Sequence, residues 1–126
     1  MNNPKILIIE DTESLRESLR DILTFEGGLQ VIVSENGQEG IDKAKEHLPD
    51  LILCDIMMPI KDGYQVFDEL RHDIDLKHTP FLFLTAQSDT DNIRQKIVFG
   101  ADDDVVVKPF NVDLLLSSIK EKLQIN

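Results

Sequence analysis

Five short apolar runs, spaced along the whole chain, constrain the fold more than any other feature of the sequence. They are rich in β-branched and aromatic residues and too short to be helices, so they predict strands. Most of them are continuous rather than alternating, which is typical of strands that are buried on both faces of a parallel sheet. The runs cover residues 5–9, 29–33, 51–54, 81–84 and 105–107.

The segments between these runs have a helical period. Apolar residues recur there every three or four positions, which predicts amphipathic helices over residues 15–23, 40–48, 63–71, 89–99 and 112–123. Strands and helices that alternate through right-handed crossovers form an open, doubly wound sheet. We therefore predict one domain over residues 1–126, a flavodoxin-like (βα)5 three-layer α/β sandwich with a parallel sheet of strand order 2-1-3-4-5.

An excess of acidic residues limits the partners of this chain. Its 126 residues include 24 Asp and Glu against 13 Lys and Arg, a formal net charge of −11. Nucleic acids and anionic membranes are bound largely through basic side chains, so neither is expected as a direct partner. The chain shows no apolar run long enough to span a bilayer and no signal-peptide pattern. With a lone cysteine, Cys54, the expected location is the cytoplasm.

Polar residues stand directly after four of the five apolar runs. They are Glu10 and Asp11, Asp55, Thr85, and Lys108. Ligands of open α/β sheets bind beyond the carboxyl ends of the strands, at the point where the strand order reverses. Because the first and third strands are neighbours in the predicted order, the three carboxylates are expected to converge there.

Three converging carboxylates repel one another unless a cation or protons neutralise them. Oxygen ligands without His or Cys favour a hard ion such as Mg²⁺. A carboxylate can act as a covalently phosphorylated nucleophile, and a lysine and a hydroxyl stabilise the oxygens of a phosphoryl group. The residues at the strand ends therefore suit Mg²⁺-dependent phosphoryl transfer to a carboxylate.

Four segments, IIED, DIMMPIKDG, LTA and VKPF, each end a predicted strand. In this order and spacing, the chain resembles the receiver domain of two-component response regulators. The resemblance implies a phosphorylation switch that receives its phosphoryl group from a sensor histidine kinase or a phosphotransfer protein. It also implies that the domain controls an effector domain or a downstream protein and forms a phosphorylation-dependent homodimer. The domain is then no enzyme for other substrates, since it catalyses only its own phosphorylation and dephosphorylation.

The resemblance gives the acidic cluster its roles. Asp55 matches the aspartate that accepts the phosphoryl group. Glu10 and Asp11 match the pair that holds Mg²⁺, with Asp11 as a direct ligand and Glu10 acting through water. Asp55 itself and the backbone carbonyl of Met57 complete the implied metal site.

Further residues match the positions that bind the phosphoryl group. Lys108 pairs with the group, the Thr85 hydroxyl moves toward it as a switch, and the backbone N–H of Ala86 donates to it. Pro109 matches a proline that follows a cis peptide bond, and Gly63 is expected to shape the loop after the acceptor.

One departure from the family lies before the lysine. The segment between Gly100 and Lys108 is one residue longer than in the family pattern. Family members often carry an aromatic residue three positions before the lysine, and its rotamer follows the switch threonine. Counting back from Lys108 gives Val105, and counting forward from Gly100 gives Asp104. We therefore predict an altered readout from Thr85 to the face formed by the fourth helix, fifth strand and fifth helix.

Two other functions are compatible with parts of this sequence. A phosphorylation-independent interaction module with a receiver fold is favoured by the missing aromatic and opposed by the complete set of site residues. The second is a Mg²⁺-dependent phosphatase that acts on other molecules. Such an enzyme needs a second acid placed after the nucleophile, and this chain has Met57 two residues after Asp55.

Several other polar residues are predicted to have no role in the site. The three histidines have no ligand spacing and are expected at the surface. Asp102, Asp103 and Asp104 are expected to form an exposed acidic loop rather than a second cation site.

Overall fold

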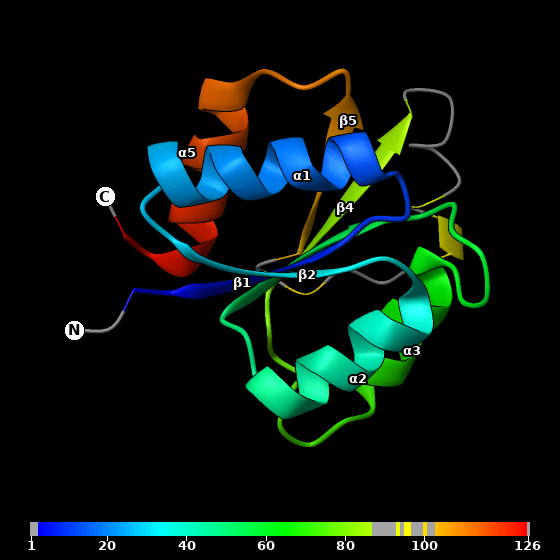
Figure 1. Ribbon diagram of the computed structural model, residues 1–126. Coiled ribbons are helices and arrows are strands. Elements are labelled where there is room, and N and C mark those ends of the chain that lie inside the picture. The colour runs from blue at the N-terminus through cyan, green and yellow to red at the C-terminus, as the bar shows by residue number, and fades with distance from the viewer. Residues whose placement is uncertain (1–2, 87–92, 94, 97–99, 101–102, 126) are drawn as a thin grey trace.

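The computed structural model describes residues 3–86, 93, 95, 96, 100 and 103–125, which build one parallel sheet between two layers of helices (Figure 1). The five strands are β1 (Lys5–Ile9), β2 (Gln30–Ser34), β3 (Leu51–Asp55), β4 (Phe81–Ala86) and β5 (Asp104–Lys108). They pair in the order β2-β1-β3-β4-β5, which confirms the predicted topology. Strands β2 to β5 each end further along the chain than predicted, so that Asp55, Thr85 and Lys108 lie inside the ladder.

The helices lie where the periodicity predicts them. They are α1 (Glu13–Asp21), which continues into the π-helical segment η1 (Ile22–Glu26), α2 (Gly37–His47), α3 (Gly63–Arg71) and α5 (Val112–Leu123). The Asn111 side chain accepts a hydrogen bond from the N–H of Leu114 at 3.1 Å and so caps α5. Most of the predicted helix over 89–99 lies outside the described residues.

Helix α2 begins three residues before its predicted start. The Asn36 side chain accepts from the N–H of Glu39 at 2.9 Å and caps the helix there. Two glycines in the first turns obscured this start, because glycine is a poor helix former. Gly40 is needed for packing, since a Cβ at this position would lie 2.5 Å from the Ile9 side chain of β1.

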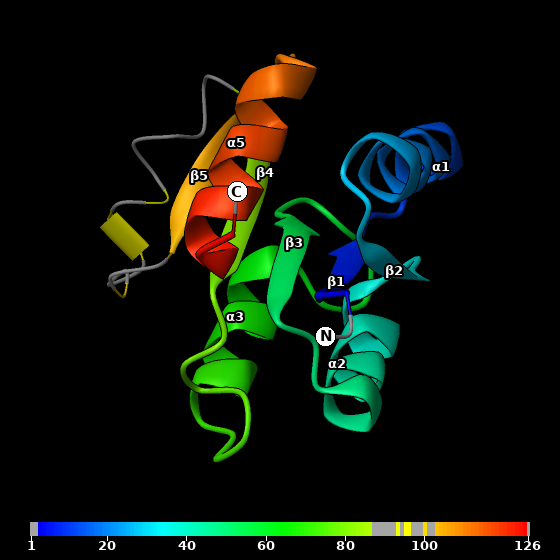
Figure 2. The same ribbon diagram turned by 90° about the vertical axis from the view of Figure 1, so that its left-hand side faces the viewer.

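Two apolar clusters fill the space between the sheet and the helix layers. Figure 2 shows α1 and α5 on one side of the sheet, and α2 and α3 on the other. Ile8, Leu53 and Leu84 point to the α1 and α5 side, whereas their strand neighbours Ile9, Cys54 and Phe83 point to the α2 and α3 side. Burial on both faces explains why the runs are continuous rather than alternating.

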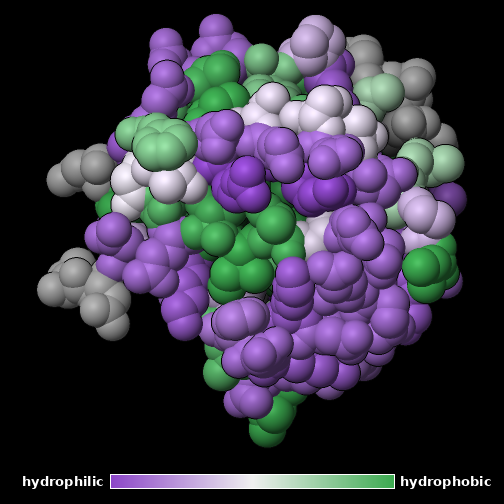
Figure 3. All heavy atoms as spheres, viewed as in Figure 1, coloured by the Kyte–Doolittle hydropathy of each residue, from purple (hydrophilic) through white to green (hydrophobic). Residues whose placement is uncertain are grey.

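The surface seen in Figure 3 is largely hydrophilic, in keeping with the charged residues of α1 and α2. A small apolar patch lies near its centre, in the region of β2, which forms one edge of the sheet. Within the part of the chain that the structure describes, no helix has both the length and the apolar character needed to cross a membrane.

The prediction of an exposed acidic loop is wrong for Asp103, which is buried, and for Asp104, which belongs to β5, whereas Asp102 lies outside the described residues. The Asp103 carboxylate pairs with the Arg71 guanidinium and accepts from the backbone N–H groups of Phe81 at 3.0 Å and Gly100 at 2.7 Å. A buried carboxylate is costly unless such partners satisfy it. Asp103 thereby joins the end of α3 to the beginning of β4 and to the turn before β5.

The described residues between Gly100 and Lys108 show where β5 begins. The N–H of Asp103 donates to the carbonyl of Gly100 at 3.2 Å, and Asp104 already belongs to β5. Val105 lies opposite Phe83 and packs in the same cluster, whereas the Asp104 carboxylate lies 3.8 Å from the Lys122 ammonium of α5. This packing favours Val105 over Asp104 as the position where an aromatic residue was expected, and the altered readout stays a prediction.

The loop that follows β3 contains a strained turn. The N–H of Lys61 donates to the carbonyl of Pro59 at 2.8 Å, and Ile60 between them has a φ of 73°. A γ-turn with positive φ is rare, and a β-branched residue fits it poorly. The Ile60 side chain is 73% exposed and so gains little packing in return.

We expect Ile60→Gly to stabilise the protein by about 0.5–1 kcal/mol, because removal of the left-handed strain outweighs the entropy cost of glycine. Urea unfolding of the variant and the parent protein measures the difference. Ile74→Gly is the control, since Ile74 is 82% exposed and does not have a positive φ. This control should lose about 0.5–1 kcal/mol. Equal losses in both variants would contradict the prediction.

Candidate functional site

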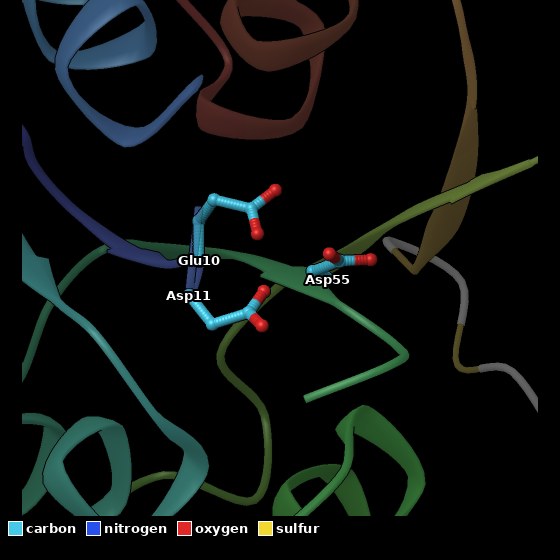
Figure 4. Close-up of side chains that lie close together, drawn as sticks. All are labelled: Glu10, Asp11 and Asp55. Atoms are coloured by element: carbon cyan, nitrogen blue, oxygen red, sulfur yellow. The ribbon is translucent and has the colours of Figure 1, made fainter. Parts of the chain in front are cut away.

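Three carboxylates from two neighbouring strands lie together at the carboxyl edge of the sheet (Figure 4). Glu10 and Asp11 directly follow β1, Asp55 ends β3, and these two strands pair side by side. One oxygen atom from each carboxylate lies within 4.8 Å of the other two. The structure thus brings together the acidic residues that the sequence predicted to converge.

Lys108, at the end of β5, faces two of these carboxylates. Its Nζ lies 3.3 Å from Asp55 Oδ2 and 3.5 Å from Glu10 Oε1. Asp55 Oδ1 accepts from the N–H of Ile56 at 2.7 Å, so each oxygen of this carboxylate has a donor. Lys108 supplies one positive charge beside three carboxylates, which leaves the cluster with an excess of negative charge.

Burial and this excess of charge change the acidity of the cluster. Burial, together with the hydrogen bond and negative charge of Asp55, raises the pKa of Glu10 to about 8. Burial lowers the pKa of Lys108, but the charges of Asp55 and Glu10 outweigh this effect and raise it overall. Without a bound cation, Glu10 therefore holds a proton near neutral pH.

Thr85 lies beside the acceptor along the edge of the sheet. It is buried, it follows Leu84, which pairs with Asp55 in the ladder, and its hydroxyl donates to the carbonyl of Ala86 at 3.3 Å. The peptide bond between Lys108 and Pro109 is cis, as predicted. The roles of the Ala86 N–H and of the Met57 carbonyl stay predictions.

Gly63 brings the start of α3 against the acceptor. A Cβ at Gly63 would lie 2.5 Å from the carbonyl oxygen of Asp55 and 2.9 Å from Cα of Ile56. The N–H of Gly63 also donates to the carbonyl of Ile56 at 2.8 Å. A side chain here would push the acceptor loop away from the helix, so only glycine fits this close approach.

Two residues that support the acidic pair were missed by sequence reasoning. Arg16 Nη1 donates to the backbone carbonyl of Glu10 at 2.9 Å, and the N–H of Glu10 donates to the carbonyl of Ser34 at 3.1 Å. Ser34 directly follows the second apolar run, and its buried hydroxyl also donates to the carbonyl of Ile8 at 3.1 Å. A basic residue in the first turns of the helix after the acidic pair is the signal that could have found Arg16.

An aromatic ring from α3 lies on the sheet face that Val105 shares. Tyr64, the one tyrosine of the chain, has its ring centre 6.3 Å from that of Phe83. The Nζ of Lys96 lies 4.8 Å from the centre of the Tyr64 ring. Phe83 pairs with Val105, so the aromatic residues near this part of β5 come from β4 and α3.

The raised pKa of Glu10 predicts how stability depends on pH in the presence of a chelator. The folded-state pKa of about 8 lies above the value of about 4.3 in an unfolded chain. The folded state therefore binds more protons between these values, and the contribution of Glu10 to stability is lost as pH rises from about 4.3 to about 8. Thermal unfolding in EDTA at several pH values measures this slope.

Glu10→Gln should remove this contribution and give a flatter dependence of Tm on pH. Glu26→Gln, which changes an exposed carboxylate of η1, should keep the parent slope. A slope that is the same in Glu10→Gln and in the parent protein would refute the assignment.

Comparison with known proteins identifies the family to which this fold belongs. The family model of the response regulator receiver domain matches residues 6–120. The response regulator ArlR of Staphylococcus aureus is 38% identical over 120 residues, which are 95% of this chain and 52% of ArlR. The chain thus spans about half the length of the curated relatives it matches.

Solved structures agree with this match. The receiver domain of a signal transduction histidine kinase from Syntrophus aciditrophicus has a TM-score of 0.85 and 36% identity, with 96% of this chain and 90% of that chain covered. The receiver domain of the Pseudomonas aeruginosa sensor histidine kinase PA1611 has a TM-score of 0.85 and 26% identity, with 97% and 98% covered. In that structure a magnesium ion is coordinated in the active site cleft. The chain belongs to the response regulator receiver domain family, whose general role is phosphorylation signalling in two-component systems.

Proposed function

We propose that this domain is a phosphorylation switch that accepts a phosphoryl group on Asp55 in a Mg²⁺-dependent reaction. The observation that carries the proposal is the position of Asp55, whose carboxylate lies 3.3 Å from the Lys108 ammonium and has an oxygen within 4.8 Å of oxygens of Glu10 and Asp11. The nucleophile, the cation site and the fixed positive charge therefore lie side by side. These are the parts that phosphoryl transfer requires.

The metal site consists of Asp11, Glu10 and Asp55, completed by the backbone carbonyl of Met57. Support comes from the donors themselves, which are all oxygens and lie within 4.8 Å of one another with an excess of negative charge. The related PA1611 receiver, which holds magnesium in its active site cleft, points the same way. When bound, Mg²⁺ neutralises the charge on the phosphoryl oxygens.

The transfer step follows from the position of the Asp55 carboxylate. Its Oδ2 attacks the phosphorus of a phosphohistidine, the P–O bond forms, and the P–N bond breaks with the imidazole as leaving group. Lys108, which lies 3.3 Å from this oxygen, then pairs with the phosphoryl oxygens instead. The product is an acyl phosphate on Asp55, and its hydrolysis later returns the free carboxylate.

The switch depends on the new charge. Phosphorylation adds about 1.5–2 negative charges at neutral pH. The Thr85 hydroxyl, now bonded to the carbonyl of Ala86, turns to donate to the phosphoryl group together with the N–H of Ala86. These bonds exist only in the phosphorylated state, so they shift an existing equilibrium toward the active conformation.

The proposal also covers partners and setting. The phosphoryl donor is a sensor histidine kinase or a phosphotransfer protein, and the output is an effector domain or a downstream protein, with a homodimer as one active form. Residues 1–126 act as one domain that catalyses only its own phosphorylation and dephosphorylation. It works in the cytoplasm, where phosphoryl donors are made from ATP. Its formal net charge of −11 disfavours direct binding of nucleic acid by this domain.

Asp55→Asn should abolish labelling by acetyl phosphate in the presence of Mg²⁺, because an amide is not a nucleophile for this reaction. The intact mass of the protein measures the label. Asp42→Asn, which changes an exposed carboxylate on α2, should be labelled like the parent protein. Full labelling of Asp55→Asn would show that the acceptor is another residue.

Beryllofluoride, a mimic of the bound phosphoryl group, should shift the methyl NMR signals of β4, β5 and α5 without a large shift confined to an aromatic side chain on that face. The reason is that Val105 replaces the aromatic residue on β5. Thr85→Ala should lose the methyl shifts, and Thr24→Ala, which changes an exposed residue of η1, should keep them. A large aromatic shift on that face refutes the altered readout. A partner bound equally with and without beryllofluoride favours the phosphorylation-independent module.

A further inference from the structure

Arg16, on α1, contacts the backbone that carries the proposed metal ligands. This half-buried side chain donates from Nη1 to the carbonyl of Glu10 at 2.9 Å. That carbonyl belongs to the peptide unit that joins Glu10 to Asp11. The guanidinium therefore holds the link between two of the acidic residues, not the acidic side chains themselves.

Other contacts fix the rest of this turn. The N–H of Glu10 donates to the carbonyl of Ser34 on β2 at 3.1 Å, and the N–H of Thr12 donates to Glu10 Oε2 at 3.3 Å. The N–H of Arg16 donates to the carbonyl of Thr12 at 2.9 Å, which begins the helical bonding of α1. The Arg16 side chain thus adds the contact that sets the peptide plane from which the exposed Asp11 projects.

We propose that Arg16 is a positioning residue for the Mg²⁺ site, an inference that rests on the proposed function. It acts by fixing the Glu10–Asp11 peptide so that both carboxylates face Asp55. Groups that orient metal ligands in this way typically change metal affinity by about 10- to 100-fold when they are removed. The planar, permanently charged guanidinium suits this task, because its donors keep a fixed direction.

The charge of Arg16 has the opposite effect on Mg²⁺. A positive charge near the site repels a divalent cation, so charge alone predicts tighter Mg²⁺ binding when Arg16 is neutralised. Loss of positioning predicts weaker binding. The sign of the change therefore separates the two explanations in a single measurement.

The test is calorimetric titration of MgCl₂ into the parent protein and Arg16→Met at constant ionic strength. Methionine keeps most of the aliphatic stem and removes both the donor and the charge. We expect the Kd for Mg²⁺ to rise about tenfold. Arg16→Lys, which keeps a charge and a donor, should recover most of that loss. Unchanged or tighter binding in Arg16→Met overturns the inference.

Arg20→Met is the matched control. Arg20 lies one turn further along α1, is exposed, and lies 4.0 Å from Glu17 and 3.9 Å from Asp21. Arg20→Met loses the same charge from the same helix as Arg16→Met. Because the ion pairs of Arg20 are with Glu17 and Asp21 and not with the acidic turn, its Kd should stay at the parent value. A rise in the Kd of Arg20→Met that equals the rise in Arg16→Met would assign the effect to charge or helix stability and overturn the inference.

Kinetics of labelling provides a second readout. In Arg16→Met, the Mg²⁺ concentration that gives half the maximal rate with acetyl phosphate should rise about tenfold, with the maximal rate nearly unchanged. If Arg16 had a purely structural role, Arg16→Met would be less stable to urea but would keep the Mg²⁺ dependence of the parent protein. This result would overturn the positioning role and leave the proposed function intact. A parent protein that binds no Mg²⁺ overturns the proposed function together with the inference, and this result is visible before any variant is compared.

Discussion

The balance of charge at the carboxyl edge of the sheet is the constraint on which the rest of the structure depends. Glu10 and Asp55 are buried there, and Asp11 adds a third carboxylate within 4.8 Å. Buried carboxylates are tolerated only with partners, and Lys108 supplies one at 3.3 and 3.5 Å. Lys108 reaches them only if β5 keeps its register on β4, so the site depends on the whole sheet being paired correctly.

Strand β5 is held at both ends by charged contacts. At its beginning, Asp103 pairs with Arg71 and binds the N–H of Phe81, and at its end Lys108 faces Asp55. The middle of the strand consists of three valines, all half-buried, that line a cavity of about 350 Å³ beside α5. Thr85 pairs with Val107 on β5, so the movement proposed for Thr85 would meet a small aliphatic side chain there rather than a ring, which is the physical basis for the proposed change in readout.

The sequence could predict the strands, their order and the acidic cluster for one shared reason. Parallel strands bring their carboxyl ends to the same edge, so a residue at the end of an apolar run is placed by the fold itself. Glu10, Asp11 and Asp55 needed no further information. Asp103 could not be predicted in this way, because its partner Arg71 lies 32 residues earlier and only tertiary packing brings the two together. Arg16 was missed because a helix period does not show which polar side chain turns back to the preceding strand.

The loop around Asp55 carries strain that the remainder of the fold must hold. Ile60 occupies a left-handed γ-turn, Gly63 packs α3 against the acceptor carbonyl, and Glu10 keeps a proton well above its ordinary pKa. The positive φ of Ile60 and the burial of Glu10 each cost free energy, and such costs gather at functional sites. In the proposed function, a bound cation would remove the cost that comes from the carboxylates, because it would replace a proton and relieve repulsion at once. Binding would thus stabilise the receiver at the edge to which the proposal assigns the reaction, while the two apolar clusters behind the sheet keep the strand ends in place.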